Sequence, residues 1–143
     1  MTVAAKMDDA RAFLDANILF SAAIGGRVRE IWSLEGVAVV TSEYAAKEAW
    51  ENLEKWPRPD EARATLAAIL SEMEVVAGTF DRTPALGVAL SDPADVPILT
   101  AAIAPGCTHL LTGDRRCFGP LFGRAVLGVM IQTPAQFLAS RRG

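Results

Sequence analysis

Three aspartates stand where a carboxylate can take part in chemistry. Asp15 ends a short apolar run and is followed two residues later by Asn17. Asp114 follows a second apolar run. Asp95 comes just before Pro97, and because proline is tolerated only in the first turn of a helix, Asp95 lies at or beside a helix N-cap. All three therefore belong to the ends of predicted strands or helices.

Each aspartate has an ordinary interpretation as well as a chemical one. Asp15 can cap a helix, Asp95 can be stabilised by a helix dipole by about 0.3–1 kcal/mol, and Asp114 can be a turn residue. Several carboxylates at one edge repel each other, so they either take up protons or bind a hard cation. An oxygen-only cluster selects Mg²⁺ or Mn²⁺, and such an ion suits the attack of water on a phosphodiester.

A parallel sheet would bring these acids together. The pattern of apolar residues, caps and breakers predicts strands at 11–16, 37–41, 74–77, 108–112 and 127–132, and helices at 17–24, 27–34, 42–56, 59–72, 94–104 and 134–138. Alternating strands and helices predict an α/β fold whose central, mainly parallel sheet of about five strands is covered on both faces. Ligands bind beyond the carboxyl ends of such strands, which is where Asp15 and Asp114 lie. Residues 86–90 are ambiguous and are expected to connect two elements.

The composition is that of one compact domain. The chain has 143 residues, of which 51% are hydrophobic and 22% charged. We expect a single domain over residues 1–143, with 1–9 as a loose N-terminal tail. No apolar stretch reaches the roughly 18–20 residues of a membrane span, and the first 11 residues do not resemble a secretory signal. The expected location is therefore the cytoplasm, without membrane contact.

The charge limits how the chain can bind nucleic acid. Its net charge is −3 and its pI about 5.1, which argues against binding by general phosphate neutralisation. A nuclease whose acidic site is offset by a bound metal remains compatible with these values. Arg115 and Arg116 form one of several small arginine clusters, each of which is ordinary for a solvated surface.

Cysteine and histidine chemistry is not expected to carry the function. Cys107 and Cys117 do not form a CxxC pair and have no nearby histidine partners for a zinc site, so we expect two reduced thiols. His109 is the only histidine, and a catalytic triad or a histidine-rich metal site would rest on it alone.

Four short motifs occur in an order and spacing that resemble PIN-domain ribonucleases. They are Phe13-Leu14-Asp15-Ala16-Asn17-Ile18-Leu19, Ser42 followed by Glu48, Asp92-Pro93-Ala94-Asp95 with Ile98-Leu99, and Leu110-Leu111-Thr112-Gly113-Asp114. The end of the chain, from 118 to 138, is similar to the PIN branch of VapC-like toxin components. The resemblance covers about residues 11–139. It implies a three-layer α/β/α sandwich and an Mg²⁺- or Mn²⁺-dependent endoribonuclease that cleaves RNA by metal-activated water.

The resemblance also implies roles for individual residues. Asp15, Glu48, Asp95 and Asp114 correspond to the catalytic and metal-binding acids, although helical spacing alone places Glu48 on a solvated face. Asn17 and Thr112 would orient carboxylates or substrate. Cognate partners would be an RNA substrate and an antitoxin protein.

One position departs from the family pattern. Many PIN domains have a further acid two residues after the Thr-x-Asp acid, and here that residue is Arg116. A second tightly held metal ion is therefore in question. Arg115 and Arg116 are instead candidates for contact with an RNA phosphate. Asp92 can replace the missing acid only in part, and its simpler interpretation is a turn residue before a proline. Ser21, one helical turn beyond Asn17, can face the site or can be an ordinary serine in the packing of the helix.

Other functional classes stay open on the sequence alone. One alternative is a catalytically degenerate PIN-like module that binds RNA or protein, supported by Arg116. Another is a phosphotransfer or phosphatase domain, which is disfavoured because no glycine-rich phosphate loop occurs. The alanine-rich helix near 60–72 would suit a homodimer.

Overall fold

Six strands form one sheet in the computed structural model, which describes residues 9–77, 101–103 and 105–142. The strands are β1 (Ala10–Leu14), β2 (Val37–Ser42), β3 (Glu74–Val76), β4 (His109–Leu111), β5 (Ala125–Val126) and β6 (Val129–Gln132). Their order is β3-β2-β1-β4-β6-β5. All neighbours pair in parallel except β5 and β6, so the prediction of a mainly parallel sheet is confirmed.

The sixth strand corrects one predicted boundary. A single strand was expected over 127–132, but Leu127 and Gly128 have φ of 49° and 87° and form the turn between β5 and β6. Two consecutive positive φ angles suit a tight two-residue hairpin, in which glycine is common and leucine is not. Because Leu127 is apolar, it extends the predicted strand and conceals the turn.

Seven helical segments, besides the short helical stretch at 101–103, complete the described fold. They are α1 (Ala16–Ala23), η2 (Arg27–Ser33), α2 (Glu43–Leu53), α3 (Pro59–Ser71), α5 (Arg115–Phe118), η5 (Gly119–Leu121) and α6 (Pro134–Arg142). The segment predicted as a helix at 27–34 is a 3-10 helix. Residues 101–103 are helical, while the rest of the helix predicted at 94–104, the ambiguous segment 86–90 and residues 1–8 of the predicted tail lie outside the described residues.

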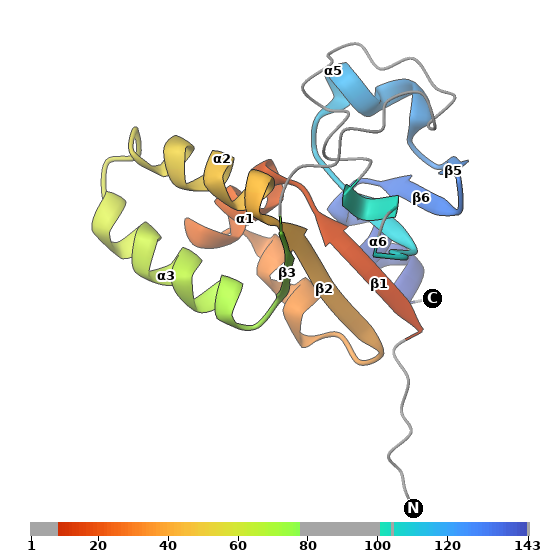
Figure 1. The fold of residues 1–143 in the computed structure, drawn as a ribbon, viewed down its shortest axis with the longest axis horizontal. Helices are drawn as coiled ribbons and strands as arrows, with labels where there is room; N and C mark the ends of the chain where they lie inside the picture. Colours follow the sequence, from red (N-terminus) through yellow and green to blue (C-terminus); the bar gives the residue numbers. More distant parts are fainter. Residues whose placement is uncertain (1–8, 78–100, 104, 143) are drawn as a thin grey trace, which may run out of the picture.

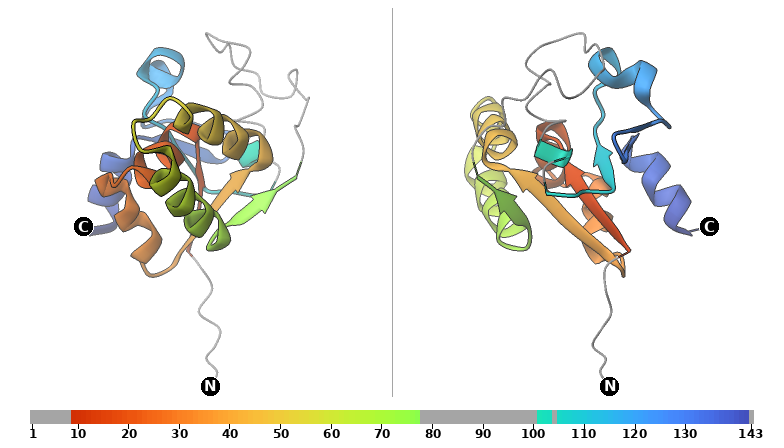
Figure 2. Two further views of the ribbon diagram at one scale, coloured as in Figure 1. Left: turned by 90° about the vertical axis from the view of Figure 1, so that its left-hand side faces the viewer. Right: turned by 45° about the vertical axis from the view of Figure 1, so that its right-hand side comes forward.

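The helices lie on both sides of the sheet, as expected for three layers. In Figure 1, α1, η2 and α6 lie behind the sheet and the residues 101–103 lie in front of it. Helices α1, α2 and α3 pack against one another at the β3 side, and Figure 2 shows α6 on the opposite side. In the described part of the chain, no helix is both long and apolar enough to cross a membrane.

The core lies between the sheet and these helices. Phe13, Leu14, Leu110 and Ile131 are fully buried on three neighbouring strands. Burial of a Leu, Ile or Phe side chain stabilises a fold by about 1.5–3 kcal/mol. Most of β1 is buried, in agreement with a central strand that is covered on both faces.

Local signals start the helices where the sequence predicts. The Ser42 hydroxyl accepts a 3.1 Å hydrogen bond from the N–H of Ala45 and caps α2. Thr133 and Gln136 bond reciprocally, side chain to backbone N–H, at 3.1 and 2.9 Å and form a capping box on α6. Both predicted N-caps are confirmed. They fix the starts of the two helices that follow β2 and β6, on the edge where the acids lie.

Candidate metal and RNA site

Asp15 is a buried carboxylate at the junction of β1 and α1. It is the N-cap of α1, only 5% exposed, and its Oδ1 accepts a 2.7 Å hydrogen bond from the N–H of Ala16. Strand β1 therefore ends at Leu14 and α1 begins at Ala16, one to two residues earlier than predicted. The extended ψ of 164° at Asp15 stops the strand and lets the side chain cap the helix.

Thr112 and Asn17 hold the other oxygen of Asp15. The Thr112 hydroxyl donates a 2.8 Å hydrogen bond to Asp15 Oδ2, and the Asn17 amide donates a second one at 3.2 Å. Asn17 Oδ1 in turn accepts the N–H of Gly113 at 3.0 Å. The ends of β1 and β4 are thus joined by side chains, and the carboxylate of Asp15 has a fixed orientation.

Asp114 is bound to the same hydroxyl. Its backbone N–H donates a 3.1 Å hydrogen bond to Thr112 Oγ1, and its Oδ1 accepts the N–H of Arg116 at 3.1 Å. Asp114 is half-buried where the chain enters α5. The structure therefore places Asp15 and Asp114 around one threonine at the carboxyl edge of the sheet.

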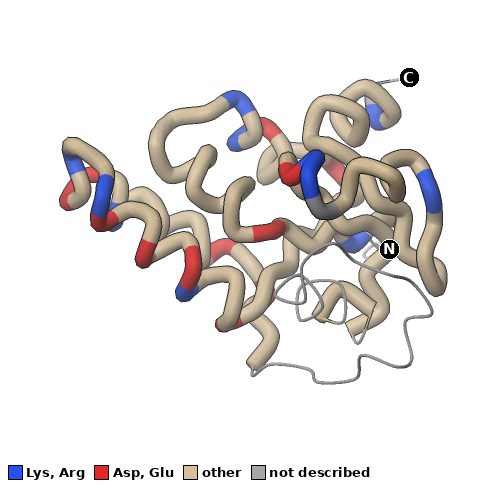
Figure 3. Tube along the Cα trace, turned by 90° about the horizontal axis from the view of Figure 1, so that it is seen from above, with Lys and Arg blue, Asp and Glu red and all other residues tan. Residues whose placement is uncertain are grey.

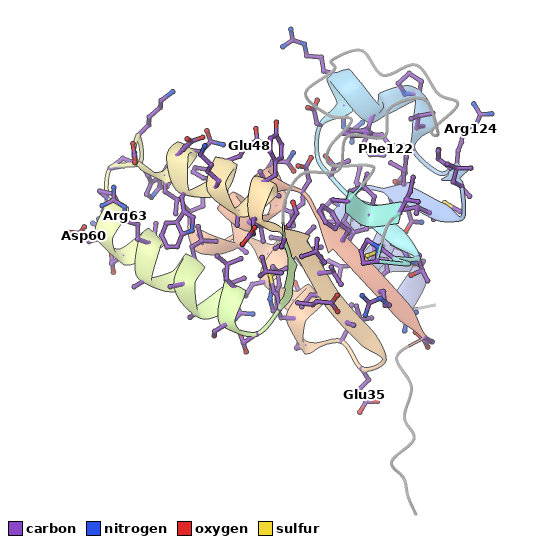
Figure 4. The ribbon with its side chains drawn as sticks, viewed as in Figure 1. Glu35, Glu48, Asp60, Arg63, Phe122 and Arg124 are labelled. Atoms are coloured by element: carbon purple, nitrogen blue, oxygen red, sulfur yellow. The ribbon has the colours of Figure 1, made fainter. Side chains whose placement is uncertain are left out.

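The other two predicted acids come from different segments. Glu48 is half-buried on α2 and points to the upper side in Figure 4, the side toward which β1 and β2 run, whereas Glu35 lies at the opposite end of the molecule. Asp95, like Asp92, lies outside the described residues. Within the described ranges no three His, Cys, Asp or Glu residues lie together as a metal-binding group. The prediction that Asp95 joins the described acids therefore stays a prediction.

The donor chemistry of the site fits a hard divalent ion. Its predicted ligands are carboxylates, and Asp15 is fixed by hydrogen bonds in the way that ligands of metal ions usually are. These features agree with Mg²⁺ or Mn²⁺ and not with a softer metal.

Arg115 and Arg116 are exposed on α5, directly after Asp114. The backbone N–H of Arg116 donates a hydrogen bond to the Asp114 carboxylate. Arg116, which stands where many PIN domains have an acid, therefore lies beside Asp114, and its side chain is exposed to solvent. Figure 3 shows Lys and Arg at several separate places along the described chain, with Asp and Glu among them. Arg115 and Arg116 are therefore a local pair of basic residues beside Asp114.

A cleft of about 420 Å³ opens beside the acids. It is lined by Asn17, Ile18, Ser21, Val28, Gly113, Asp114 and Pro134. Ser21 is thus in the cleft wall, although it also packs tightly on Gly26. The sequence did not indicate Val28 or Pro134 as site residues. One signal was available for Pro134, because it follows β6, a third strand that ends at this edge of the sheet.

Cys107 and His109 lie away from the acids. Burial raises the pKa of the Cys107 thiol to about 11, which keeps it protonated. Burial, and then the charge of Arg141, lower the pKa of His109 below its ordinary value. The His109 ring packs edge-on against Phe137 with ring centroids 4.9 Å apart. Both residues therefore act as packing groups; the side chain of Cys117 is not described.

Comparison with known proteins gives a family match and several structural neighbours. A family model described as PIN domain matches residues 11–116. No curated protein sequence matches significantly. The VapBC2 complex from Rickettsia felis, solved with a promoter DNA fragment, is similar with a TM-score of 0.60 and 16% identity over 86% of this chain and 98% of the other.

Two further structures have the same fold. VapC20 of Mycobacterium tuberculosis, described as a sarcin-ricin loop cleaving toxin, has a TM-score of 0.58 and 16% identity over 80% of this chain and 98% of the other. VapBC-1 of nontypeable Haemophilus influenzae has a TM-score of 0.58 and 15% identity over 87% of this chain and 98% of the other. At these identities the likeness concerns the fold, and the three-layer α/β/α prediction is confirmed.

Proposed function

Because the chain belongs to the PIN-domain family, we propose that it is a divalent-metal-dependent endoribonuclease and the toxin of a toxin–antitoxin pair. The observation that carries the proposal is that one threonine, Thr112, binds both the carboxylate of Asp15 and the backbone N–H of Asp114 at the carboxyl edge of a parallel sheet. This is the edge at which α/β sheets bind ligands. Its natural location is the cytoplasm, where RNA is available.

Asp15, Glu48, Asp95 and Asp114 would hold the ion. A divalent ion bound by carboxylates lowers the pKa of a water molecule and neutralises charge on the phosphodiester. Mg²⁺ and Mn²⁺ are the candidates because the proposed ligands are oxygens.

The residues around Asp15 have a positioning function in this proposal. Thr112 and Asn17 fix the carboxylate so that it need not reorganise when substrate binds. Arg115 and Arg116 would contact RNA phosphates, since guanidinium groups pair well with phosphate oxygens. Their placement beside Asp114 gives an acidic protein a basic contact where the substrate must bind.

The proposed partners are RNA and an antitoxin. Two of the structural neighbours are VapBC complexes, and a third is described as a toxin that cleaves the sarcin-ricin loop, which supports these partners for a chain with the same fold. A homodimer through α3 is a further proposal. In α3, Leu66 and Ile69 are buried, and the exposed apolar residues are Ala64, Ala67 and Ala68. Light scattering of the full chain tests it.

A catalytically degenerate RNA- or protein-binding module is the second candidate. Arg116 favours it, because this residue stands where many PIN domains have another acid. The two functions differ in one respect: only the nuclease requires the divalent ion for turnover.

RNA cleavage in Mg²⁺ or Mn²⁺ tests the proposal. EDTA should abolish cleavage, and Asp15→Asn and Asp95→Asn should each remove it while the circular dichroism spectrum stays unchanged. Asp60→Asn is the matched control, because Asp60 is an almost fully exposed aspartate on α3 and pairs only with Arg63 at 3.6 Å among the described residues. Cleavage that persists in both site variants would overturn the site, and cleavage by none of the proteins would favour the degenerate module.

A further inference from the structure

A groove leads away from the carboxylates between η2 and α6. The cleft beside Asp114 continues into a second hollow of about 500 Å³, because both are lined by Val28, Gly113 and Pro134. We call the second hollow the η2–α6 groove. Its walls include Arg27 and Val28 on η2, Arg115 beside Asp114, and Pro134, Leu138 and Ala139 on α6.

The groove has an apolar floor and a rim with two arginines, Arg27 and Arg115, and one acid, Glu30, so its rim carries a net positive charge. Val28 and Leu138 are half-buried, and Ala139 is exposed. The Arg27 side chain is 91% exposed and pairs with Glu30 at 3.8 Å, a distance and exposure at which an ion pair holds weakly. In the described part of the chain, no ion pair involves Arg115. Both guanidinium groups can therefore bind an anion.

Helix α6 adds to the positive potential of the groove. The helix has nine residues and begins at Pro134, and its first residues line the groove. The N-terminal end of a helix carries a partial positive charge that favours anions. The apolar floor and the net positive rim together match a group with one apolar face and one negative charge.

We propose that the η2–α6 groove binds one unpaired nucleotide of the RNA, next to the phosphodiester at Asp15 and Asp114. The base lies on the apolar floor formed by Val28 and Leu138, and its phosphate binds Arg115. This inference rests on the proposed ribonuclease function and adds to it a nucleotide subsite outside the carboxylates. It also assigns a substrate contact to α6, which carries none of the acids.

The dimensions and the position of the groove favour this occupant. Pockets for small ligands have volumes of about 300–1,000 Å³, so 500 Å³ accommodates one nucleotide. Proteins recognise single-stranded RNA by stacking splayed bases on aromatic side chains or on arginine guanidinium planes, and this groove supplies guanidinium groups from Arg27 and Arg115. An acidic peptide would match the charge as well. The direct continuation of the groove into the cleft at Asp114 favours the RNA strand that passes the acids.

Filling the groove tests the inference. A fluorescent ten-nucleotide single-stranded RNA is titrated by anisotropy into the full chain, with Asp15→Asn present in every protein to prevent cleavage. Ala139→Leu fills the groove at an exposed helix position, and Ala67→Leu on α3 is the matched control. Ala139→Leu should raise Kd about fivefold or more, on the scale of a lost base contact, while Ala67→Leu should leave it unchanged.

An abasic scan of the same RNA gives a second readout. Removal of one particular base should weaken binding to the protein with the native groove and have little effect when Ala139→Leu is present. Equal Kd values for the Ala139→Leu and Ala67→Leu proteins would overturn the inference. The inference would also be overturned if Ala139→Leu raised the Kd of a labelled hexaglutamate peptide but left the Kd of the RNA unchanged. RNA cleavage by the chain without these substitutions is measured separately. This measurement distinguishes failure of the proposed ribonuclease function from failure of the proposed nucleotide site in the groove.

Discussion

The Thr112 hydroxyl donates a 2.8 Å hydrogen bond to Asp15 Oδ2 and joins residues 97 positions apart in the sequence. The hydroxyl oxygen of Thr112 also accepts a hydrogen bond from the backbone N–H of Asp114 at 3.1 Å and one from the Asn17 side-chain amide at 3.3 Å. A hydroxyl has one donor and two acceptor positions, so all three are used. Thr112 is fully buried, and its hydroxyl ties the Asp15 carboxylate to the backbone that carries Asp114.

Thr112→Val should therefore lower both stability and cleavage. Valine keeps the shape of threonine but leaves Asp15 without one donor in a buried site, which costs about 1–3 kcal/mol. We expect a lower unfolding midpoint in urea and a reduced kcat with little change in KM.

Thr112→Ser is the control for this change, because serine keeps the hydroxyl. It should retain most of the activity. If Thr112→Val cleaves RNA as fast as Thr112→Ser, the hydroxyl has no positioning function.

Gly26→Ala should destabilise the fold at the wall of the cleft. A Cβ at Gly26 would lie 2.3 Å from the Ser21 hydroxyl oxygen and 2.7 Å from the Ser21 carbonyl oxygen, and the carbonyl belongs to the backbone of α1. Such overpacking costs about 1–3 kcal/mol. At Gly119 an added Cβ meets no atom within 4 Å, so Gly119→Ala should be close to neutral by thermal unfolding. Equal melting temperatures for the two variants would contradict the packing seen at Ser21.

The single histidine predicts a pH dependence of stability. Because burial lowers the pKa of His109, the unfolded chain binds a proton more readily than the folded one as the pH falls below about 6.5. Stability should therefore be full above this pH and decrease below it. Urea unfolding at pH 7.5 and pH 5.5 measures the change. His109→Gln should reduce the decrease, and an equal decrease in both proteins would assign it to carboxylates alone.

The fold was predictable because its local signals agree. Alternating apolar strands and helices, the cap at Ser42 and the capping box at Thr133 each specify the observed element. The errors arise where a residue departs from its usual preference. Leu127 adopts a positive φ that its apolar side chain does not suggest, and Asp15 ends a strand by capping a helix instead of extending the strand.

The site was predictable only in part. Asp15, Thr112 and Asp114 lie at the ends of adjacent parallel strands, so their proximity follows from topology. Glu48 lies on a helix face that periodicity assigns to solvent, and only the family resemblance selected it. The η2–α6 groove depends on the packing of two segments far apart in the sequence, which no local pattern encodes.

Titration of the full chain with Mn²⁺ by calorimetry tests the central claim most directly. The native sequence and the matched control Asp60→Asn should bind Mn²⁺ with the same affinity, because Asp60 lies on α3 and has no part in the site. Asp15→Asn should lose at least about tenfold in affinity, as loss of groups that support a metal site typically does. Equal Mn²⁺ affinity for the native sequence and for Asp15→Asn would contradict the account.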